Sequence, residues 1–188
     1  MSPIIVDDAI PNAQAVREAG LRAPYVDWPA HDGEVYKRVS LVHVPGLQEA
    51  IEAKLGPVEM LGMGYRLNFN GELPNAAIHS DMGWGTHAAV LYLSEGEGGT
   101  AFWKHLATGA HRIDPGDMEL FEQIKDDWDD AGKWEQIALA EMKLGRLLIY
   151  ESALFHSRWP FAAFGTDYDS GRLVAVAFFD VKGQQCVA

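Results

Sequence analysis

A histidine and an aspartate stand two residues apart in the segment His79-Ser80-Asp81, just before an apolar run over 88–93. Side chains at positions i and i+2 of an extended chain project to the same side, so His79 and Asp81 can converge on one point. Imidazole nitrogens and carboxylate oxygens are common ligands of transition metals. The spacing therefore predicts two of the three protein ligands of a metal site.

The third ligand must come from another part of the chain. Of the other histidines, His156 is favoured because it follows the apolar strand expected over 146–151 by a short turn. It lies far from His79 in sequence, so only the fold can bring the two together.

An arginine begins the last apolar segment of the chain. Alternation over 172–181 places Arg172 on the same face as Val174, Val176 and Phe178. An unpaired guanidinium on an apolar face is costly, and its planar fork binds a carboxylate bidentately. We therefore expect a carboxylate partner, which is either a ligand or a protein group such as Asp180.

Short strands separated by turns dominate the chain from residue 58 onward. Strands are predicted over 63–69, 75–79, 87–93, 100–103, 135–142, 146–151 and 172–181. Upstream, the patterns predict strands over 4–6 and 35–44, a loop over 23–33, and helices over 11–22 and 47–55. Asp117 is expected to cap a later helix that runs to about Asp130.

This arrangement predicts a mainly β protein with flanking helices, built as an antiparallel double-sheet jelly roll. The length of 188 residues suits one domain over 1–188. Residues 1–57 are expected to form supporting helices and strands, and residues 58–181 the jelly-roll core.

Composition and charge narrow the function classes. The net charge of −12 argues against nucleic acid as a partner, since phosphate binding relies on clustered Lys and Arg. The single cysteine, Cys186, excludes an intramolecular disulfide and a thiolate metal cage. Neither a signal peptide nor an apolar run of roughly 20 residues is visible, so we expect a cytoplasmic protein with no membrane partner.

Several motifs occur together in one order. They are His79-Ser80-Asp81, Val90-Leu91-Tyr92-Leu93-Ser94, Gly98-Gly99-Thr100-Ala101-Phe102, Gly145-Arg146-Leu147-Leu148-Ile149-Tyr150, His156-Ser157-x-x-Pro160 and Gly171-Arg172. As a set they resemble the Fe(II)- and 2-oxoglutarate-dependent oxygenases, specifically the prolyl 4-hydroxylase-like branch and its small phage and bacterial relatives. The resemblance covers about Gly64 to Val181.

This resemblance implies a double-stranded β-helix, the cupin-like form of the jelly roll. In it His79, Asp81 and His156 would hold Fe(II) as a facial triad, with 2-oxoglutarate and O₂ in the open positions. Arg172 would bind the distal carboxylate of 2-oxoglutarate. The implied reaction hydroxylates a C–H bond of a peptidyl or free amino acid, or of another small molecule, with succinate and CO₂ as co-products. Because Asp81 occupies a ligand position, no position is open for a halide ion, which favours hydroxylation over halogenation.

The sequence departs from the resemblance at two points. The related enzymes have about ten residues between the distal histidine and the basic clamp, whereas here His156 and Arg172 are further apart. The extra residues over 161–170 are expected to form a loop that could line the substrate entrance. Arg158 is the alternative clamp. The tyrosine that often precedes the His-x-Asp motif is also out of place, which leaves Tyr65 and Tyr92 as candidate cofactor contacts.

Other readings stay open for the remaining polar and aromatic residues. Tyr92 could instead fill the barrel. The candidate substrate contacts are Arg66, Asn68, Trp84, Trp103 and Arg158. Arg66 and Asn68 could equally form a polar outer face, and the tryptophans could belong to the core. A non-catalytic metal-binding jelly roll is the alternative function, a hydroxylase acting on nucleic acid would need a basic groove, and the oligomeric state is unknown.

Overall fold

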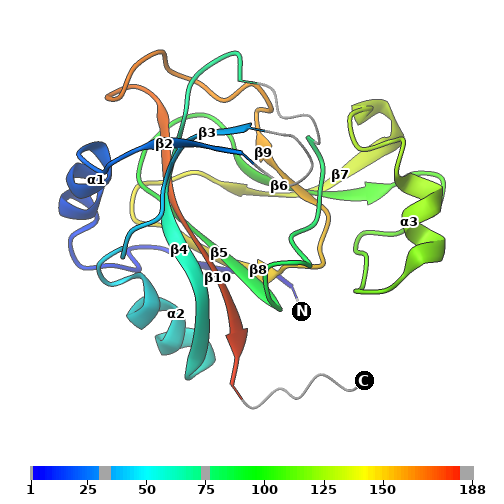
Figure 1. Ribbon diagram of the computed structural model, residues 1–188, viewed down its shortest axis with the longest axis horizontal. Coiled ribbons are helices and arrows are strands. Elements are labelled where there is room, and N and C mark those ends of the chain that lie inside the picture. The colour runs from blue at the N-terminus through cyan, green and yellow to red at the C-terminus, as the bar shows by residue number, and fades with distance from the viewer. Residues whose placement is uncertain (1, 30–34, 73–76, 183–188) are drawn as a thin grey trace.

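The computed structural model describes residues 2–29, 35–72 and 77–182, which form two antiparallel sheets (Figure 1). The seven-stranded sheet has the order β1 (Ile4–Val6), β8 (Leu147–Glu151), β5 (His87–Tyr92), β10 (Arg172–Val181), β4 (Val58–Asn68), β3 (Val35–Ser40) and β2 (Val26–Pro29). The three-stranded sheet has the order β7 (Trp134–Glu141), β6 (Gly99–His105) and β9 (His156–Trp159). The prediction of a mainly β double-stranded β-helix with flanking helices is confirmed.

The large sheet has a different core on each face. Helices α1 (Ala13–Leu21) and α2 (Leu47–Leu55) pack on its outer face, where Val16, Leu47 and Ile51 meet Leu91 and Leu173. Its inner face turns toward the small sheet, and the residues buried between them are Ala88, Val90, Tyr92, Phe102, Ala140, Met142, Leu148, Tyr150, Leu154 and Val174. We call this space the barrel interior.

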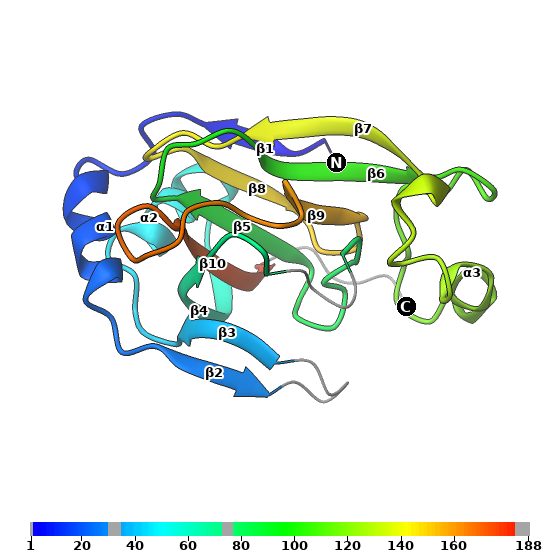
Figure 2. The same cartoon turned by 90° about the horizontal axis from the view of Figure 1, so that it is seen from above.

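A third core covers the other side of the small sheet. Helix α3 (Met118–Ile124) lies there, far from α1 and α2 (Figures 1 and 2). Ile124 is completely buried and packs with Trp103, Trp134 and Phe155. This layer supports the small sheet from outside, so it does not contribute to the barrel interior.

Strand register determines which polar residues face the barrel interior. Arg172 lies opposite Asn68, and Val174 lies opposite both Arg66 in β4 and Tyr92 in β5. Directly opposed residues of antiparallel strands point to the same face. Arg66 and Asn68 therefore face inward with Arg172, which decides against a polar outer face for these two side chains.

The helices begin close to the predicted positions, and one ends early. Helix α2 covers the predicted 47–55, whereas α1 begins at Ala13 with Asn12 as its cap. The Asp117 carboxylate accepts a hydrogen bond from the Leu120 backbone N–H at 3.0 Å, as expected for a cap. Helix α3 nevertheless ends at Ile124 and not at about Asp130, because Asp127 is held by His105 through its carboxylate and by Trp134 through its carbonyl group.

Three strand predictions need correction. The expected loop over 23–33 contains β2, which pairs with β3 at the edge of the large sheet. The segment after the predicted turn, 156–159, is β9 and pairs with β6. Of the predicted strand over 75–79, residues 75 and 76 lie outside the described residues, and the rest forms only an isolated bridge between His79 and His156. Such short strands form because they pair with segments that are distant in sequence, so the local sequence does not predict them.

The first 57 residues contribute to the large sheet as well as covering it. Strand β1 pairs with β8 at one edge, and β3 pairs with β4 near the other. No helix in the described ranges is long and apolar enough to cross a membrane.

The loop over 161–170 packs at the end of the barrel where β10 begins. The backbone N–H groups of Asn70 and Gly71 donate to the carbonyl groups of Gly165 and Ala162, at 2.7 and 2.9 Å. Phe164 packs against the core of the barrel interior. The loop therefore covers the Arg172 end, and its expected part in a substrate entrance stays a prediction.

Substitution of Gly64 by alanine tests how closely β3 and β4 must approach. A Cβ atom at Gly64 would overlap the backbone carbonyl oxygen of Ser40, whereas a Cβ at Gly62 in the same strand would meet nothing within 4 Å. We expect Gly64→Ala to lower the free energy of unfolding by about 1–3 kcal/mol, because backbone atoms must move. Gly62→Ala, the matched control, should change it by no more than about 0.5–1 kcal/mol. Urea unfolding of both variants checks this, and equal losses would contradict the packing argument.

Candidate functional site

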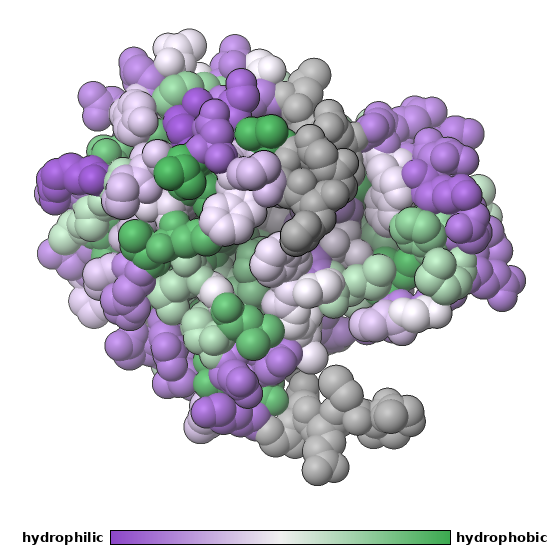
Figure 3. All heavy atoms as spheres, viewed as in Figure 1, coloured by the Kyte–Doolittle hydropathy of each residue, from purple (hydrophilic) through white to green (hydrophobic). Residues whose placement is uncertain are grey.

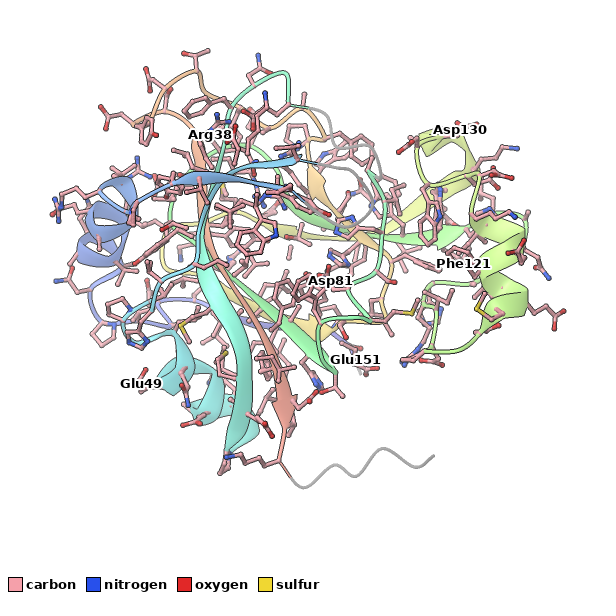
Figure 4. All side chains as sticks on the ribbon, in the orientation of Figure 1. Arg38, Glu49, Asp81, Phe121, Asp130 and Glu151 are labelled. Atoms are coloured by element: carbon pink, nitrogen blue, oxygen red, sulfur yellow. The ribbon has the colours of Figure 1, made fainter. Side chains whose placement is uncertain are left out.

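His79, Asp81 and His156 come together at the inner side of the sheets, as the sequence predicted. One ligand atom from each residue lies within 4.8 Å of the others. His156 Nε2 is 3.1 Å from Asp81 Oδ2, and His79 Nε2 is 3.8 Å from Asp81 Oδ1. Figure 4 shows Asp81 in the middle of the molecule, away from the α3 side that carries Phe121 and Asp130. This geometry leaves one common point for a bound cation.

Backbone hydrogen bonds hold the three residues in place. The N–H of His79 donates to the carbonyl of His156 at 3.0 Å, and the N–H of His156 donates back at 2.8 Å. The N–H of Asp81 donates to the carbonyl of Ser152 at 2.7 Å, in the turn after β8. The segment before β5 is therefore fixed against two other parts of the barrel.

The hydrogen bonds of His156 leave one nitrogen available as a ligand. Its Nδ1 atom is 2.9 Å from the carbonyl oxygen of Leu154, and a carbonyl can only accept, so Nδ1 carries a proton. Its Nε2 atom therefore faces Asp81. Because the carboxylate is itself an acceptor, either a second proton or a cation must lie between them, and Asp81 accordingly raises the pKa of His156 despite burial.

His79 and Asp81 are in the protonation states that metal binding requires. Burial and the neighbouring His156 lower the pKa of His79, so its imidazole is neutral at pH 7. The His79 Nδ1 atom is buried without a hydrogen-bond partner among the residues described. Burial would raise the pKa of Asp81, but His156, His79 and Arg66 outweigh it and lower that pKa, so the carboxylate is ionised. A neutral His79, an ionised Asp81 and the Nε2 atom of His156, from which a metal would displace the proton shared with Asp81, fit a facial metal triad.

Arg172 is buried without a carboxylate partner in the described part of the chain. It is 4% exposed, its Nη2 atom donates only a long 3.4 Å hydrogen bond to Gly99, and its Nε atom has no partner among the described residues. Burial lowers its pKa to about 10. Asp180, the expected protein alternative, accepts instead from the backbone of Thr86 at 2.8 Å. A buried guanidinium in this state fits an anionic ligand.

Arg158 holds the chain around the barrel end. Its guanidinium donates to the carbonyl group of Phe161, with Nε at 2.9 Å and Nη2 at 2.6 Å, and also to the carbonyl group of Glu72. These contacts connect β9 with the turn after β4. Arg158 therefore stabilises the backbone at this end of the barrel, whereas Arg172 donates only the long hydrogen bond to Gly99 among the described residues.

The two candidate cofactor tyrosines lie on opposite faces of the large sheet. Tyr92 points into the barrel interior, where its hydroxyl group lies 2.8 Å from Thr100 Oγ1 and 3.1 Å from the Ala140 carbonyl oxygen. It therefore connects the two sheets. Tyr65 points to the outer face and packs in the core under α1, so its prediction as a cofactor contact is wrong. The alternation along β4 that turns Arg66 inward turns Tyr65 outward.

The tryptophans also separate into core and surface. Trp103 is 4% exposed, lies in the core beneath α3, and donates from Nε1 to Ser157 Oγ at 2.9 Å, so its prediction as a substrate contact is wrong. Trp159 packs against it with ring centroids 5.8 Å apart. Trp84 is 60% exposed and lies 5.7 Å from the ring of Phe178, which packs against the inner core.

Tyr150 belongs to the site, although the sequence did not single it out. Its hydroxyl group lies 3.5 Å from Asp81 Oδ2, and its ring centroid is 4.8 Å from that of His156. Burial and the Asp81 charge raise its pKa well above the ordinary value, so it stays a neutral donor. The sequence could have indicated this residue, because Tyr150 lies two residues after Leu148 in an apolar strand. Both side chains therefore project to the same, inward face.

Solved structures with a similar fold include those of 2-oxoglutarate-dependent enzymes. The alpha-ketoglutarate-dependent epimerase SnoN from nogalamycin biosynthesis has a TM-score of 0.58 at 14% identity, over 97% of this chain and 84% of that one. The carbocyclase SnoK from the same biosynthesis gives 0.57 at 15%, over 95% and 80%. HygX from Streptomyces hygroscopicus, with nickel and 2-oxoglutarate bound, gives 0.52 at 12%, over 96% and 83%. At these identities the likeness establishes the fold.

Comparison with curated proteins finds no match. A protein family does match, over residues 75–179, and this range contains His79, Asp81, His156 and Arg172. The match covers more than half of the chain, so this protein belongs to DUF6445, a family of unknown function.

Proposed function

We propose that this protein is an Fe(II)- and 2-oxoglutarate-dependent oxygenase that hydroxylates a C–H bond of a small molecule. His79, Asp81 and His156 would hold the metal, and Arg172 would bind the distal carboxylate of 2-oxoglutarate. When bound, Fe(II) and 2-oxoglutarate supply the activation of O₂: one oxygen atom enters the substrate C–H bond as a hydroxyl group, and the other enters succinate as 2-oxoglutarate loses CO₂.

The buried guanidinium of Arg172 carries this proposal. A metal-binding jelly roll without catalysis would explain the triad, but it would leave a buried cation with no carboxylate partner in the described chain. A dicarboxylate that reaches from the triad into the barrel would supply the missing partner. A metal held by the triad would bind one end of 2-oxoglutarate. The guanidinium of Arg172, on the same inner face, would bind the carboxylate at the other end.

The residues of this chain would prepare the site before the cofactors bind. The Leu154 carbonyl group fixes the tautomer of His156 and so directs its Nε2 atom to the metal. Tyr150 is placed to donate to Asp81 and to restrict the orientation of that carboxylate. The apolar residues of the barrel interior would exclude water, which strengthens the pairing of Arg172 with an anion.

Finer assignments are also part of the proposal. The substrate would be a peptidyl or free amino acid, or another small molecule, as in the prolyl 4-hydroxylase-like branch. Trp84 is the candidate aromatic contact with the substrate because it is exposed beside Phe178.

The net charge of −12 disfavours nucleic acid as a partner. We place the protein in the cytoplasm.

Removal of His79 should abolish metal-dependent turnover of 2-oxoglutarate. With Fe(II), O₂ and 2-oxoglutarate, we expect succinate formation by the unmodified protein and at least a 100-fold loss of it in His79→Ala. The reason is that loss of a ligand must cost more than the roughly 10–100-fold caused by loss of an outer-shell partner. His43→Ala, at an exposed position, is the control. Succinate formation that survives the loss of His79 would refute the assignment.

Binding of 2-oxoglutarate to the Ni(II)-loaded protein distinguishes whether Arg172 or Arg158 binds its distal carboxylate. Arg172→Gln should weaken binding at least about 30-fold, because breaking a buried, hydrogen-bonded charge pair costs 2 kcal/mol or more. Arg158→Gln should change it much less, since that side chain braces the backbone. Calorimetry with metal bound measures both. The opposite order would make Arg158 the clamp, and intact metal binding without any 2-oxoglutarate binding would favour the non-catalytic alternative.

A further inference from the structure

The direction of the Arg172 side chain depends on the backbone that carries it. Within the described ranges, the guanidinium makes only the 3.4 Å hydrogen bond from Nη2 to the carbonyl oxygen of Gly99, and its Nε atom has no partner. A long side chain with one weak contact at its end can adopt several rotamers unless its surroundings are fixed. Whatever fixes the chain on both sides of Arg172 therefore influences how the guanidinium meets a bound anion.

The pairing of β10 with β5 stops before it reaches Arg172. The last paired residues are Val174 in β10 and Tyr92, the final residue of β5. Continued by two residues in the same antiparallel register, this pairing places Ser94 opposite Arg172. Ser94 is thus the neighbour of the arginine on the β5 side, at a point where the regular backbone ladder has ended.

The hydroxyl group of Ser94 replaces the missing backbone hydrogen bonds. Its Oγ atom donates to the carbonyl oxygen of Gly171 at 3.0 Å and accepts from the backbone N–H of Leu173 at 2.9 Å. These two residues stand directly before and directly after Arg172. A single side-chain atom therefore holds the backbone on both sides of the arginine.

Arg17 in helix α1 completes the hydrogen bonding of this hydroxyl group. Its Nη1 atom donates to Ser94 Oγ at 3.0 Å and to the carbonyl oxygen of Leu93 at 2.7 Å, and its Nη2 atom donates to the carbonyl oxygen of Asp169 at 2.7 Å. A hydroxyl group has one proton to donate and two lone pairs to accept, so Ser94 uses all of them within the chain. Ser94 is also buried, and it acts on the site through the backbone and not by touching a ligand.

We propose that Ser94 is a positioning residue that directs the guanidinium of Arg172, and that it thereby sets the preference of the site for a 2-oxo dicarboxylate over a 2-oxo monocarboxylate. This inference rests on the proposed function, which assigns Arg172 to the distal carboxylate of 2-oxoglutarate. Loss of the Oγ atom would leave the Gly171 carbonyl group and the Leu173 N–H group without their buried partner. The backbone would shift to find other partners, so the guanidinium would no longer be held ready for a carboxylate.

Binding of two 2-oxo acids to the Ni(II)-loaded protein tests this proposal. 2-Oxoglutarate has a distal carboxylate, whereas pyruvate has only the 2-oxo acid group that a metal would bind. We expect Ser94→Ala to weaken 2-oxoglutarate binding about tenfold, and to change the binding of pyruvate and of Ni(II) by less than about twofold, all measured by calorimetry. Ser40→Ala is the matched control, because Ser40 is a buried serine whose hydroxyl group has no hydrogen-bond partner among the residues described, and it should leave all three affinities unchanged.

A double variant shows whether the effect of Ser94 passes through Arg172. In the Arg172→Gln protein, Ser94→Ala should weaken 2-oxoglutarate binding further by less than about twofold, because no guanidinium remains to be positioned. A merely structural role would weaken binding equally in both backgrounds. Equal weakening of 2-oxoglutarate and pyruvate, or a tenfold effect that persists without the guanidinium, would overturn the inference.

Arg17→Gln is the second variant, and it decides the question if Ser94→Ala fails to fold, which a loss of Ni(II) binding would reveal. It keeps the serine and removes only the charged donor, so we expect 2-oxoglutarate binding to weaken about threefold while pyruvate binding stays the same. In that case, unchanged 2-oxoglutarate binding would overturn the inference. The two proposals fail differently: an unmodified Ni(II)-loaded protein that does not bind 2-oxoglutarate refutes the proposed function, whereas normal binding by the variants refutes only the role of Ser94.

Discussion

The reciprocal backbone hydrogen bonds between His79 and His156 are the constraint on which the site depends. They join a segment that precedes β5 to the first residue of β9, and these two elements belong to different sheets. With this bridge in place, Asp81 faces both imidazoles and Tyr150 lies beside them. The metal-binding geometry is therefore a property of how the two sheets close on each other.

Burial of charge explains the rest of the arrangement. Asp81 remains ionised because His156, His79 and Arg66 surround it, while Arg172 is surrounded by apolar strands and has its pKa lowered. Each charged group thus lacks something that a ligand would provide: a cation for the triad and an anion for the guanidinium. The face in Figure 3 shows apolar patches among polar residues.

Alternating inward and outward side chains made several assignments predictable from sequence. Arg172 with Val174, and Arg66 with Asn68, follow the twofold period of their strands. The same period, applied to β4, would have turned Tyr65 outward, and in β8 it would have indicated Tyr150. In β6 the same period separates Trp103 from the inward-facing Phe102 and places it with Ala101 in the core beneath α3.

The sequence by itself determined the class of fold, the order of most strands and the residue types of the site, because these depend on local periodicity and on short motifs. The tertiary structure alone decided that β2 and β9 are strands, that α3 ends at Ile124, and that Arg172 has no carboxylate partner within the described chain. These features depend on contacts between residues far apart in sequence. The free energies of burial, of strand pairing and of charge pairing arise only when such contacts form, so local sequence patterns do not predict them.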